Sequence, residues 1–261
     1  MAALDPWLPA LHRSHRRLAD VVTPLSDEEV SGQSYDDEWS IAQVLSHLGS
    51  GAEIFGLFIS AGLDGTPVPG PEAFGPIWER WNAKSPSDQS ADALTADRAF
   101  LDRLDALDDA QGRAWHLDMF GSDRDLVTVL QMRLGEHVLH TWDVAVTVDH
   151  DDTLPVDAVD LLIDVVDQMV ERVAKPPAEP VRLRVTTHQP DRQFVLTLGD
   201  SGGQLADLDA SDTSSEGPKL DLPAESLIRL VYGRLDPDHT PGSVTAEGIE
   251  LDILRRVFPG F

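Results

Sequence analysis

The chain has 261 residues, of which 41% are hydrophobic and 25% charged, a composition typical of globular proteins with one or two domains. Its formal net charge of -26 argues against nucleic acid and anionic membrane surfaces as partners, because both attract basic proteins. The sequence has no cysteine, so histidine and carboxylate groups must hold any metal, and any reactive thiol must come from another molecule. The N-terminal segment lacks the apolar core of a signal peptide and no apolar run is long enough to span a membrane, which predicts a cytoplasmic protein.

Helical patterns fill the first half of the chain. The first follows Asp5, a predicted N-cap, with Pro6 at the first helical position. The second follows Ser40, another predicted N-cap, and carries apolar residues at helical spacing. A loop rich in proline and glycine is expected over residues 65–76. Further helices are expected over residues 74–84, 90–107 and 125–148. Long helices with short joints predict an up-and-down bundle of about four helices.

The pattern changes after the polar segment 149–155, which predicts a boundary between a domain at residues 1–150 and a domain at residues 151–261. The second domain is expected to be a small α+β domain, because helical patterns flank alternating, strand-like ones. Its expected elements are a helix at 156–175, strands at 181–188, 192–200 and 201–210, a polar loop at 211–218, a helix after Pro223, and an extended piece with a terminal helix at 242–261.

The segment RLGEHVLHTWD, residues 133–143, places titratable side chains along one line of a helix. Glu136 and His140 are separated by about 40° around the axis, and Asp143 returns to within about 20° of Glu136. His47 lies on an otherwise apolar helix in the first half of the chain. If His47 converges with Glu136 and His140, they form the three-ligand set of a catalytic zinc site, which leaves one position for water or substrate.

Plainer interpretations stand beside the metal site. Glu136 and His140 at this spacing also fit a surface pair, and His47 also fits a core histidine with a satisfied hydrogen bond. His137 lies on another face of the same helix and competes for the ligand role. Asp143 either accepts the second N–H of a ligand imidazole or contacts the substrate.

Two stretches of the sequence carry a resemblance to a known family. WSIAQVLSHL, followed later by RLGEHVLHTWD, resembles the mycothiol-dependent maleylpyruvate isomerase family, within the wider superfamily of DinB-like four-helix bundles. LPAESLIRLVYGRL through FPGF resembles the C-terminal domain of that family, which is similar to sterol-carrier-protein folds. The resemblance implies a DinB-like bundle followed by a sterol-carrier-like α+β domain.

The resemblance also implies site residues and a cosubstrate. The metal ligands of the family, normally around Zn2+, match His47, Glu136 and His140. The acidic residue after the last ligand in the family matches Asp143. The arginine of the family's C-terminal Gly-Arg pair, which is implicated in activity there, matches Arg234. Members use mycothiol, the low-molecular-weight thiol of actinobacteria, which agrees with a chain that has no cysteine.

The implied function is the addition of a zinc-activated thiolate to a small electrophile, in a monomer or weak homodimer. The net charge of -26 and the lack of a basic cluster disfavour a dianionic substrate, so a mycothiol S-transferase stands beside a cis–trans isomerase. A metal-water hydrolase or lyase on the same scaffold is one alternative. A carrier whose C-terminal domain holds an apolar ligand is another.

Overall fold

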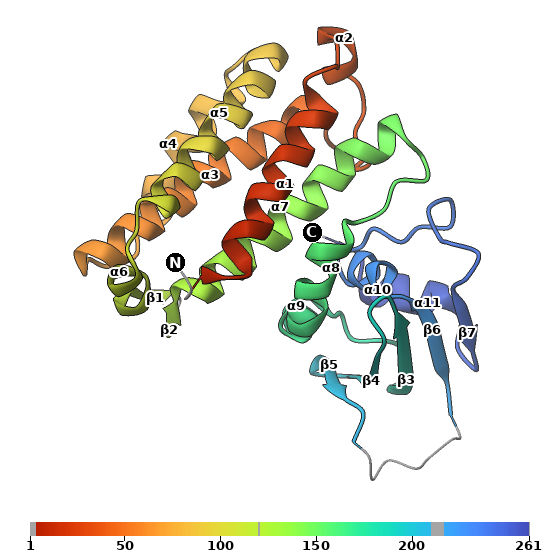
Figure 1. The fold of residues 1–261 in the computed structure, drawn as a ribbon. Helices are drawn as coiled ribbons and strands as arrows, with labels where there is room; N and C mark the ends of the chain where they lie inside the picture. Colours follow the sequence, from red (N-terminus) through yellow and green to blue (C-terminus); the bar gives the residue numbers. More distant parts are fainter. Residues whose placement is uncertain (1–3, 120, 210–216, 261) are drawn as a thin grey trace. The chain divides into compact units, whose positions relative to one another are not determined.

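The structure is a computed structural model, and it describes residues 4–119, 121–209 and 217–260. The chain divides into two compact units, Met1–Asp152 and Thr153–Phe261 (Figure 1). The division falls inside the polar segment 149–155 where the sequence predicts a boundary. A helical first unit and a sheet-containing second unit confirm the predicted fold class.

The first unit is built from helices, with one short β-hairpin before the last of them. The helices are α1 (Trp7–Val22), α2 (Asp27–Val30), α3 (Ile41–Asp64), α4 (Pro71–Asn82), α5 (Pro86–Asp105), α6 (Asp109–Ala114) and α7 (Leu126–Val148). The hairpin strands β1 (His116–Met119) and β2 (Ser122–Asp125) pair antiparallel. The sequence analysis did not predict this hairpin or the short helices α2 and α6.

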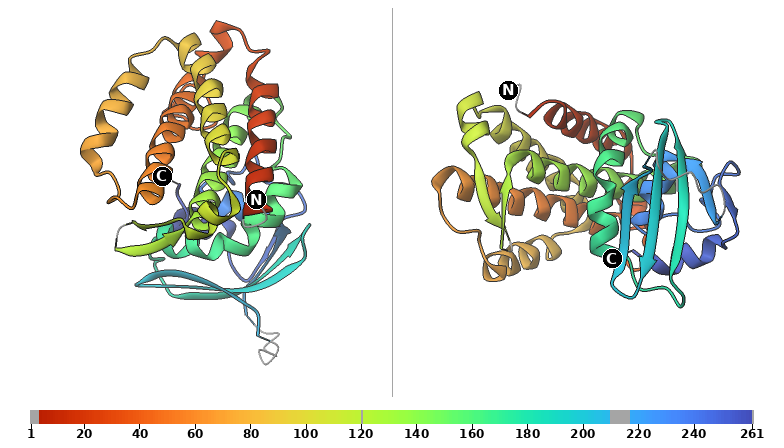
Figure 2. Two further views of the ribbon diagram at one scale, coloured as in Figure 1. Left: turned by 60° about the vertical axis from the view of Figure 1, so that its left-hand side comes forward. Right: turned by 90° about the horizontal axis from the view of Figure 1, so that it is seen from below.

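Four long helices, α1, α3, α5 and α7, pack together as a bundle, and α4 lies at its edge against α3 (Figure 2). Helices α3 and α5 run in the same direction: Arg133 bonds both Leu48 of α3 and Asp97 of α5, and further along both helices Arg103 of α5 bonds the Gly56 carbonyl of α3. The predicted up-and-down alternation therefore fails between α3 and α5 among the four long helices, and is met when α4 is counted between them. Helix α4 is the return segment that allows two consecutive bundle helices to be parallel.

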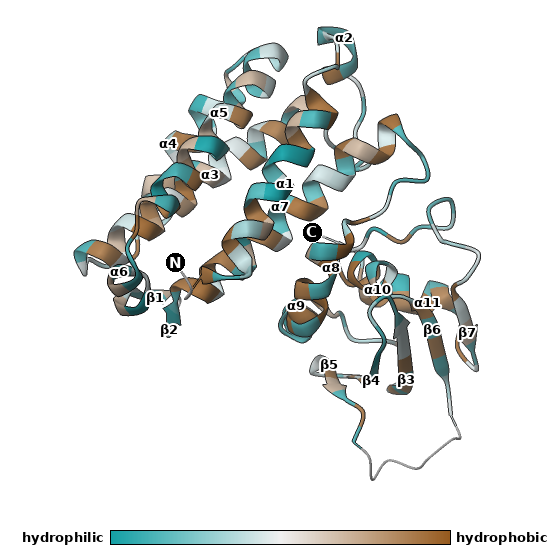
Figure 3. Cartoon of the chain, viewed as in Figure 1, coloured by the Kyte–Doolittle hydropathy of each residue, from teal (hydrophilic) through white to brown (hydrophobic). Residues whose placement is uncertain are grey.

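The first residues of three helices can be explained by local chemistry, and at two of these helices the predicted start needs correction. Ser40 caps α3 in a capping box with Gln43, as the sequence predicts. At α1 the N-cap residue is Pro6 and no side chain caps the helix, so the prediction for Asp5 is wrong. Helix α4 begins at Pro71, inside the predicted loop, because proline is well suited to the first helical turn. Hydrophobic and hydrophilic residues follow one another along α1 and α5 (Figure 3), as expected of amphipathic helices with one buried face.

The second unit packs helices against a five-stranded sheet of order β5-β4-β3-β6-β7. Alternate side chains of the central strands are buried, among them Leu183, Leu196 and Leu220, so one face of the sheet forms the core. The strands are β3 (Val181–His188), β4 (Arg192–Gly199), β5 (Gly202–Asp207), β6 (Lys219–Pro223) and β7 (Thr245–Glu247). The helices are α8 (Val156–Leu162), η2 (Ile163–Val165), α9 (Val166–Val173), α10 (Ala224–Val231) and α11 (Leu251–Val257).

The predicted hairpin of β3 and β4 and the third strand beside β4 are confirmed. The predicted single helix over 156–175 is wrong, because the 3-10 turn η2 separates α8 from α9. The sequence analysis did not predict strand β6, which pairs parallel with β3. The predicted polar loop lies largely outside the described residues.

Among the described residues, α3 alone is long and apolar enough to cross a membrane by length and composition. Most of its apolar window is buried inside the first unit. Its apolar character is therefore that of a helix in the middle of a bundle.

Gly62 of α3 provides a test of packing in the first unit. A Cβ built on Gly62 would lie 2.2 Å from Cε2 of the buried Trp115 ring. We expect Gly62→Ala to lower the free energy of unfolding by about 1–3 kcal/mol, because the fixed ring must move. Urea unfolding followed by circular dichroism measures this. The control Gly75→Ala in α4, where nothing lies within 4 Å, should be neutral or stabilising by up to about 1 kcal/mol. Equal losses in both variants would contradict the packing argument.

Candidate metal centre

Antiparallel packing of α3 and α7 brings the predicted ligands together. His47 of α3 faces Glu136 of α7, and one turn further along α3 the glycine Gly51 faces Arg133, which is one turn earlier on α7. Glu136 and His140 lie on the same side of α7 because they are one helical turn apart. The sequence spacing and the helix direction therefore place three donor groups in one location.

The three donors are close enough to share one cation. One ligand atom from each of His47, Glu136 and His140 lies within 4.8 Å of the others. The distance between His47 Nε2 and Glu136 Oε2 is 3.2 Å, and that between His140 Nε2 and the same oxygen is 3.7 Å. Tetrahedral zinc with ligand bonds of about 2.0–2.2 Å separates neighbouring donors by about 3.4 Å. The residues therefore fit a zinc ion in donor type and in spacing.

Asp143 orients His140. The distance between His140 Nδ1 and Asp143 Oδ2 is 2.8 Å, and the Asp143 side chain is fully buried. A proton on Nδ1 that is donated to Asp143 leaves the lone pair of Nε2 directed at the cluster, which is the tautomer that binds metal. Of the two roles that the sequence allows for Asp143, this geometry favours the orienting one.

Trp39 forms an aromatic wall beside the cluster. Its ring centroid is 5.4 Å from that of His47 and 6.1 Å from that of His140, and it is nearly parallel to the His140 ring. Trp39 precedes α3 in a segment that Ser34 holds through bonds to the Trp39 carbonyl. Trp39 therefore lies beside two of the three donor side chains, although the sequence analysis assigned it no role.

Glu136 is held as a carboxylate. Burial by itself raises the pKa of Glu136, but the hydrogen bond from His47 and the charges of His140, His47 and Arg133 outweigh it and lower the pKa to about 2. Its side chain keeps 35% of its surface exposed, so the cluster is open on one side. An ionised, partly exposed carboxylate between two imidazoles is what a divalent cation requires.

His137 is not part of the cluster. It is fully buried, where Ser14 Oγ lies 2.7 Å from its Nδ1 and Asp97 Oδ2 lies 3.0 Å from its Nε2. His15 and Arg133 also bond to Asp97, at 2.9 Å and 2.8 Å. His137 therefore belongs to a buried polar network and not to the cluster of possible metal ligands. The sequence analysis did not predict this network.

Arg234 belongs to the second unit. Its side chain is nearly buried, and its Nη1 donates a 2.7 Å bond to the Tyr232 carbonyl. Arg229 supports the same turn through a bond to the Arg234 carbonyl. The role of Arg234 toward thiol or substrate stays a prediction from the family resemblance.

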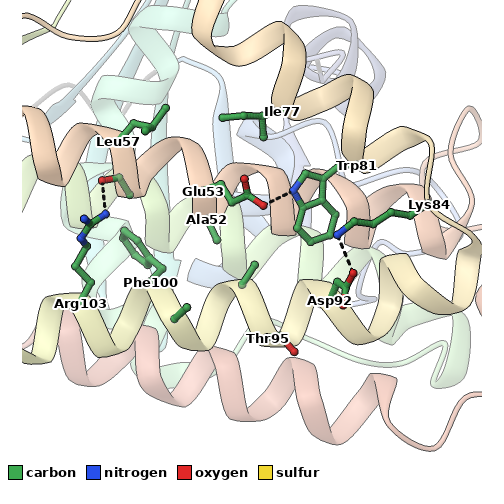
Figure 4. Close-up of a pocket in the computed structure, with 13 residues that line it drawn as sticks. Ala52, Glu53, Leu57, Ile77, Trp81, Lys84, Asp92, Thr95, Phe100 and Arg103 are labelled. Carbon is green, nitrogen blue, oxygen red and sulfur yellow. Dashed lines mark hydrogen bonds and ion pairs between the residues drawn. The ribbon is translucent and has the colours of Figure 1, made fainter.

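A separate hollow of about 520 Å³ lies among α3, α4 and α5 (Figure 4). It is on the far side of α3 from His47, because Gly56 of its lining is turned by about 180° around the helix axis. Its polar groups are engaged with one another: Trp81 donates to Glu53 at 2.8 Å, and Lys84 pairs with Asp92 at 2.8 Å. We assign no ligand to it.

The first unit is a helical bundle that carries a cluster of three donors able to hold a metal ion. The family model described as the mycothiol maleylpyruvate isomerase N-terminal domain matches residues 11–145, and the model of the family's C-terminal domain matches residues 153–252. The chain belongs to the mycothiol-dependent maleylpyruvate isomerase family, a family of enzymes. The resemblance noted in the sequence is thereby confirmed.

Solved structures give the same fold. The chain is similar to the crystal structure of a mycothiol-dependent maleylpyruvate isomerase, with a TM-score of 0.67 and 14% sequence identity over 95% of this chain and 94% of that chain. A histidine-to-alanine variant of that isomerase matches with the same values. No curated protein sequence matches the chain.

Asp97 generates a prediction on stability and pH. Burial raises the pKa of Asp97, but His137, His15 and Arg133 outweigh it and hold that pKa well below its usual range. We expect Asp97→Asn to cost about 3 kcal/mol near neutral pH, because it leaves a buried arginine without its anion.

The contribution of Asp97 has a defined pH window. A depressed carboxyl pKa stabilises the fold fully above the unfolded value of about 3.9 and progressively less as pH falls toward the folded value. Urea unfolding of wild type and Asp97→Asn should be measured from about pH 7 to about pH 3. The difference between their free energies of unfolding should be constant near neutral pH and should become smaller as the pH falls toward about 3. The control Asp92→Asn, which removes an exposed carboxylate of the same helix, should change stability by about 1 kcal/mol or less. A difference in the free energy of unfolding that grows as the pH falls would contradict a lowered pKa for Asp97.

Proposed function

We propose that this protein is a zinc-dependent, mycothiol-using enzyme that adds a thiolate to an electrophilic small molecule, as a cis–trans isomerase of the maleylpyruvate type. The observation that carries the proposal is the convergence of His47, Glu136 and His140, with His140 oriented by the buried Asp143. Membership of the mycothiol-dependent isomerase family supports the thiol as cosubstrate.

Each residue has a defined task in the proposed enzyme. His47, Glu136 and His140 would hold the zinc ion, and Asp143 keeps the His140 proton on Nδ1. A zinc ion bound there supplies Lewis acidity that favours thiolate over thiol. Arg234 would bind a carboxylate of the thiol or of the substrate through its guanidinium fork.

The proposed chemistry balances without an oxidant or reductant. The thiolate sulfur forms a bond to one carbon of an activated double bond, and the π electron pair moves to the conjugated carbonyl group. The former double bond is then single, so the substrate can rotate about it. Return of the electron pair expels the thiolate and gives the trans product, with the thiol regenerated.

The charge of the chain bears on the choice of substrate. A net charge of -26 does not favour a dianionic substrate, which is the reason to keep a mycothiol S-transferase as the second candidate. In a transferase the thiol stays on the product, whereas in an isomerase it is recovered. Mass spectrometry of the product therefore separates the two.

A cytoplasmic monomer or weak homodimer stays the prediction for location and assembly.

The metal site is tested with His140→Ala. Wild type should contain about one zinc per chain by elemental analysis and bind mycothiol in calorimetric titration, and His140→Ala should lose both, because two ligands hold zinc poorly. His116→Ala removes an exposed histidine of the same unit and should behave as wild type. Zinc without thiol binding would favour the metal-water hydrolase. Wild type without metal would favour the carrier.

Arg234→Gln tests the second unit. We expect mycothiol or substrate binding to weaken by about 10–100-fold, equivalent to about 1.5–3 kcal/mol for a hydrogen bond to a charged group. Zinc content should not change, because Arg234 is not a metal donor. The matched control is Arg192→Gln, which removes an arginine at the start of β4 that pairs with Asp164. If both variants bind thiol and substrate like wild type, Arg234 has no role in binding.

A further inference from the structure

Arg133 is a buried cation one helical turn from the ligand Glu136. Its side chain is 1% exposed. Its Nη2 donates to Asp97 Oδ1 of α5 at 2.8 Å and to the Leu48 carbonyl of α3 at 3.1 Å. Arg133 itself belongs to α7, so one guanidinium joins the two helices that carry the ligands to a third.

Gly51 makes this position of Arg133 available. A Cβ built on Gly51 would lie 2.9 Å from Arg133 Nη1, a separation that real Cβ atoms essentially never show. Gly51 is one turn after His47 on α3, and Arg133 is one turn before Glu136 on α7. The arginine–glycine contact is therefore the next layer of the interface that contains the metal ligands.

The surroundings of Arg133 hold the guanidinium still. Its central carbon lies 5.7 Å from the ring centroid of Phe55 and 5.8 Å from that of Phe100. Its carboxylate partner Asp97 is fixed in turn by the bonds from His15 and His137. The guanidinium therefore has few positions to move to, and α3 and α7 cannot approach or separate at this level without breaking these contacts.

Stability alone is a weak explanation for the pair. Desolvation makes buried ion pairs poor stabilisers, and apolar replacements of both partners are often neutral or better. Arg133 Nε, in addition, is a buried polar atom without a hydrogen-bond partner in the described part of the chain. Burial of this ion pair and of the unpaired Nε atom costs free energy, so a positioning role explains Arg133 better than stability does.

We infer that Arg133, held by Asp97 and accommodated by Gly51, is a positioning residue that sets the separation of His47 and Glu136 and thereby the affinity of the metal site. The inference rests on the proposed metal-binding function. It assigns no contact with metal, thiol or substrate to Arg133.

The test measures metal affinity and coordination geometry in the full chain, without an activity assay. Zinc affinity is obtained by competition with a chromophoric chelator, and Co2+ loaded in place of zinc reports coordination through its visible absorption. The variants are Arg133→Met, which removes the charge and the bonds, and Gly51→Ala, which keeps the arginine but displaces it. The double variant Arg133→Met with Asp97→Asn removes both charges and serves if Arg133→Met alone does not fold.

The matched control is Arg103→Met. Arg103 also donates from a neighbouring helix to a carbonyl of α3, at 3.0 Å from Gly56, but on the face of α3 turned away from His47. We expect the Arg133 and Gly51 variants to bind zinc about 10–100-fold more weakly, with a changed Co2+ spectrum, as is typical when groups that orient metal ligands are lost. Arg103→Met should lower thermal stability and leave affinity and spectrum unchanged.

The outcomes separate this inference from the proposed function. Wild type that binds neither zinc nor Co2+ overturns the proposed metal function, and the inference falls with it. If wild type binds metal and the folded Arg133 and Gly51 variants bind it equally well, with the same Co2+ spectrum, the inference alone is overturned. Loss of affinity in Arg103→Met to the same degree also overturns it, because the effect would then follow from general destabilisation.

Discussion

The packing of α3 against α7 is the constraint on which the rest of the site depends. His47 comes from one helix, Glu136 and His140 come from the other, and their distances are fixed by how closely and in what register the helices cross. Small residues are needed in that interface wherever a large side chain fills it from the opposite helix, as Gly51 shows beside Arg133. The bundle thus holds the three donors in place, and facing helices commonly position metal ligands in this way.

Helix positions were predictable because apolar spacing and N-caps are local signals. The helix after Ser40, the helix that ends at Val148 and most of α4 were predicted correctly, whereas the start of α4 at Pro71 and the break within 156–175 did not follow from periodicity. The directions of the helices were not predictable, since a bundle in which α3 and α5 are parallel has the same hydrophobic pattern as one in which they alternate. Direction depends on whether α4 packs as a return helix, and that is decided by tertiary contacts with α3.

The site residues were predictable only in part. Spacing on α7 puts Glu136, His140 and Asp143 on one face, but the link to His47 needed the family resemblance, because helix spacing does not report which helices meet. Asp97 gave a signal that was overlooked: it occupies a position on the apolar stripe of α5, between Ala93 and Phe100. A carboxylate on a buried stripe must find cations or donors inside the protein, and here it finds three.

The donor set explains why a thiol suits this site as a cosubstrate. In the proposed site, two imidazoles and one carboxylate would leave a bound zinc ion with net positive charge, whereas cysteine ligands from the chain would neutralise it. The Arg133–Asp97 pair, being neutral overall, does not cancel that charge. An open, positively charged position attracts an anionic ligand and lowers the pKa of a thiol that binds there. A chain without cysteine thus keeps its affinity for sulfur available to a thiol that arrives from solution.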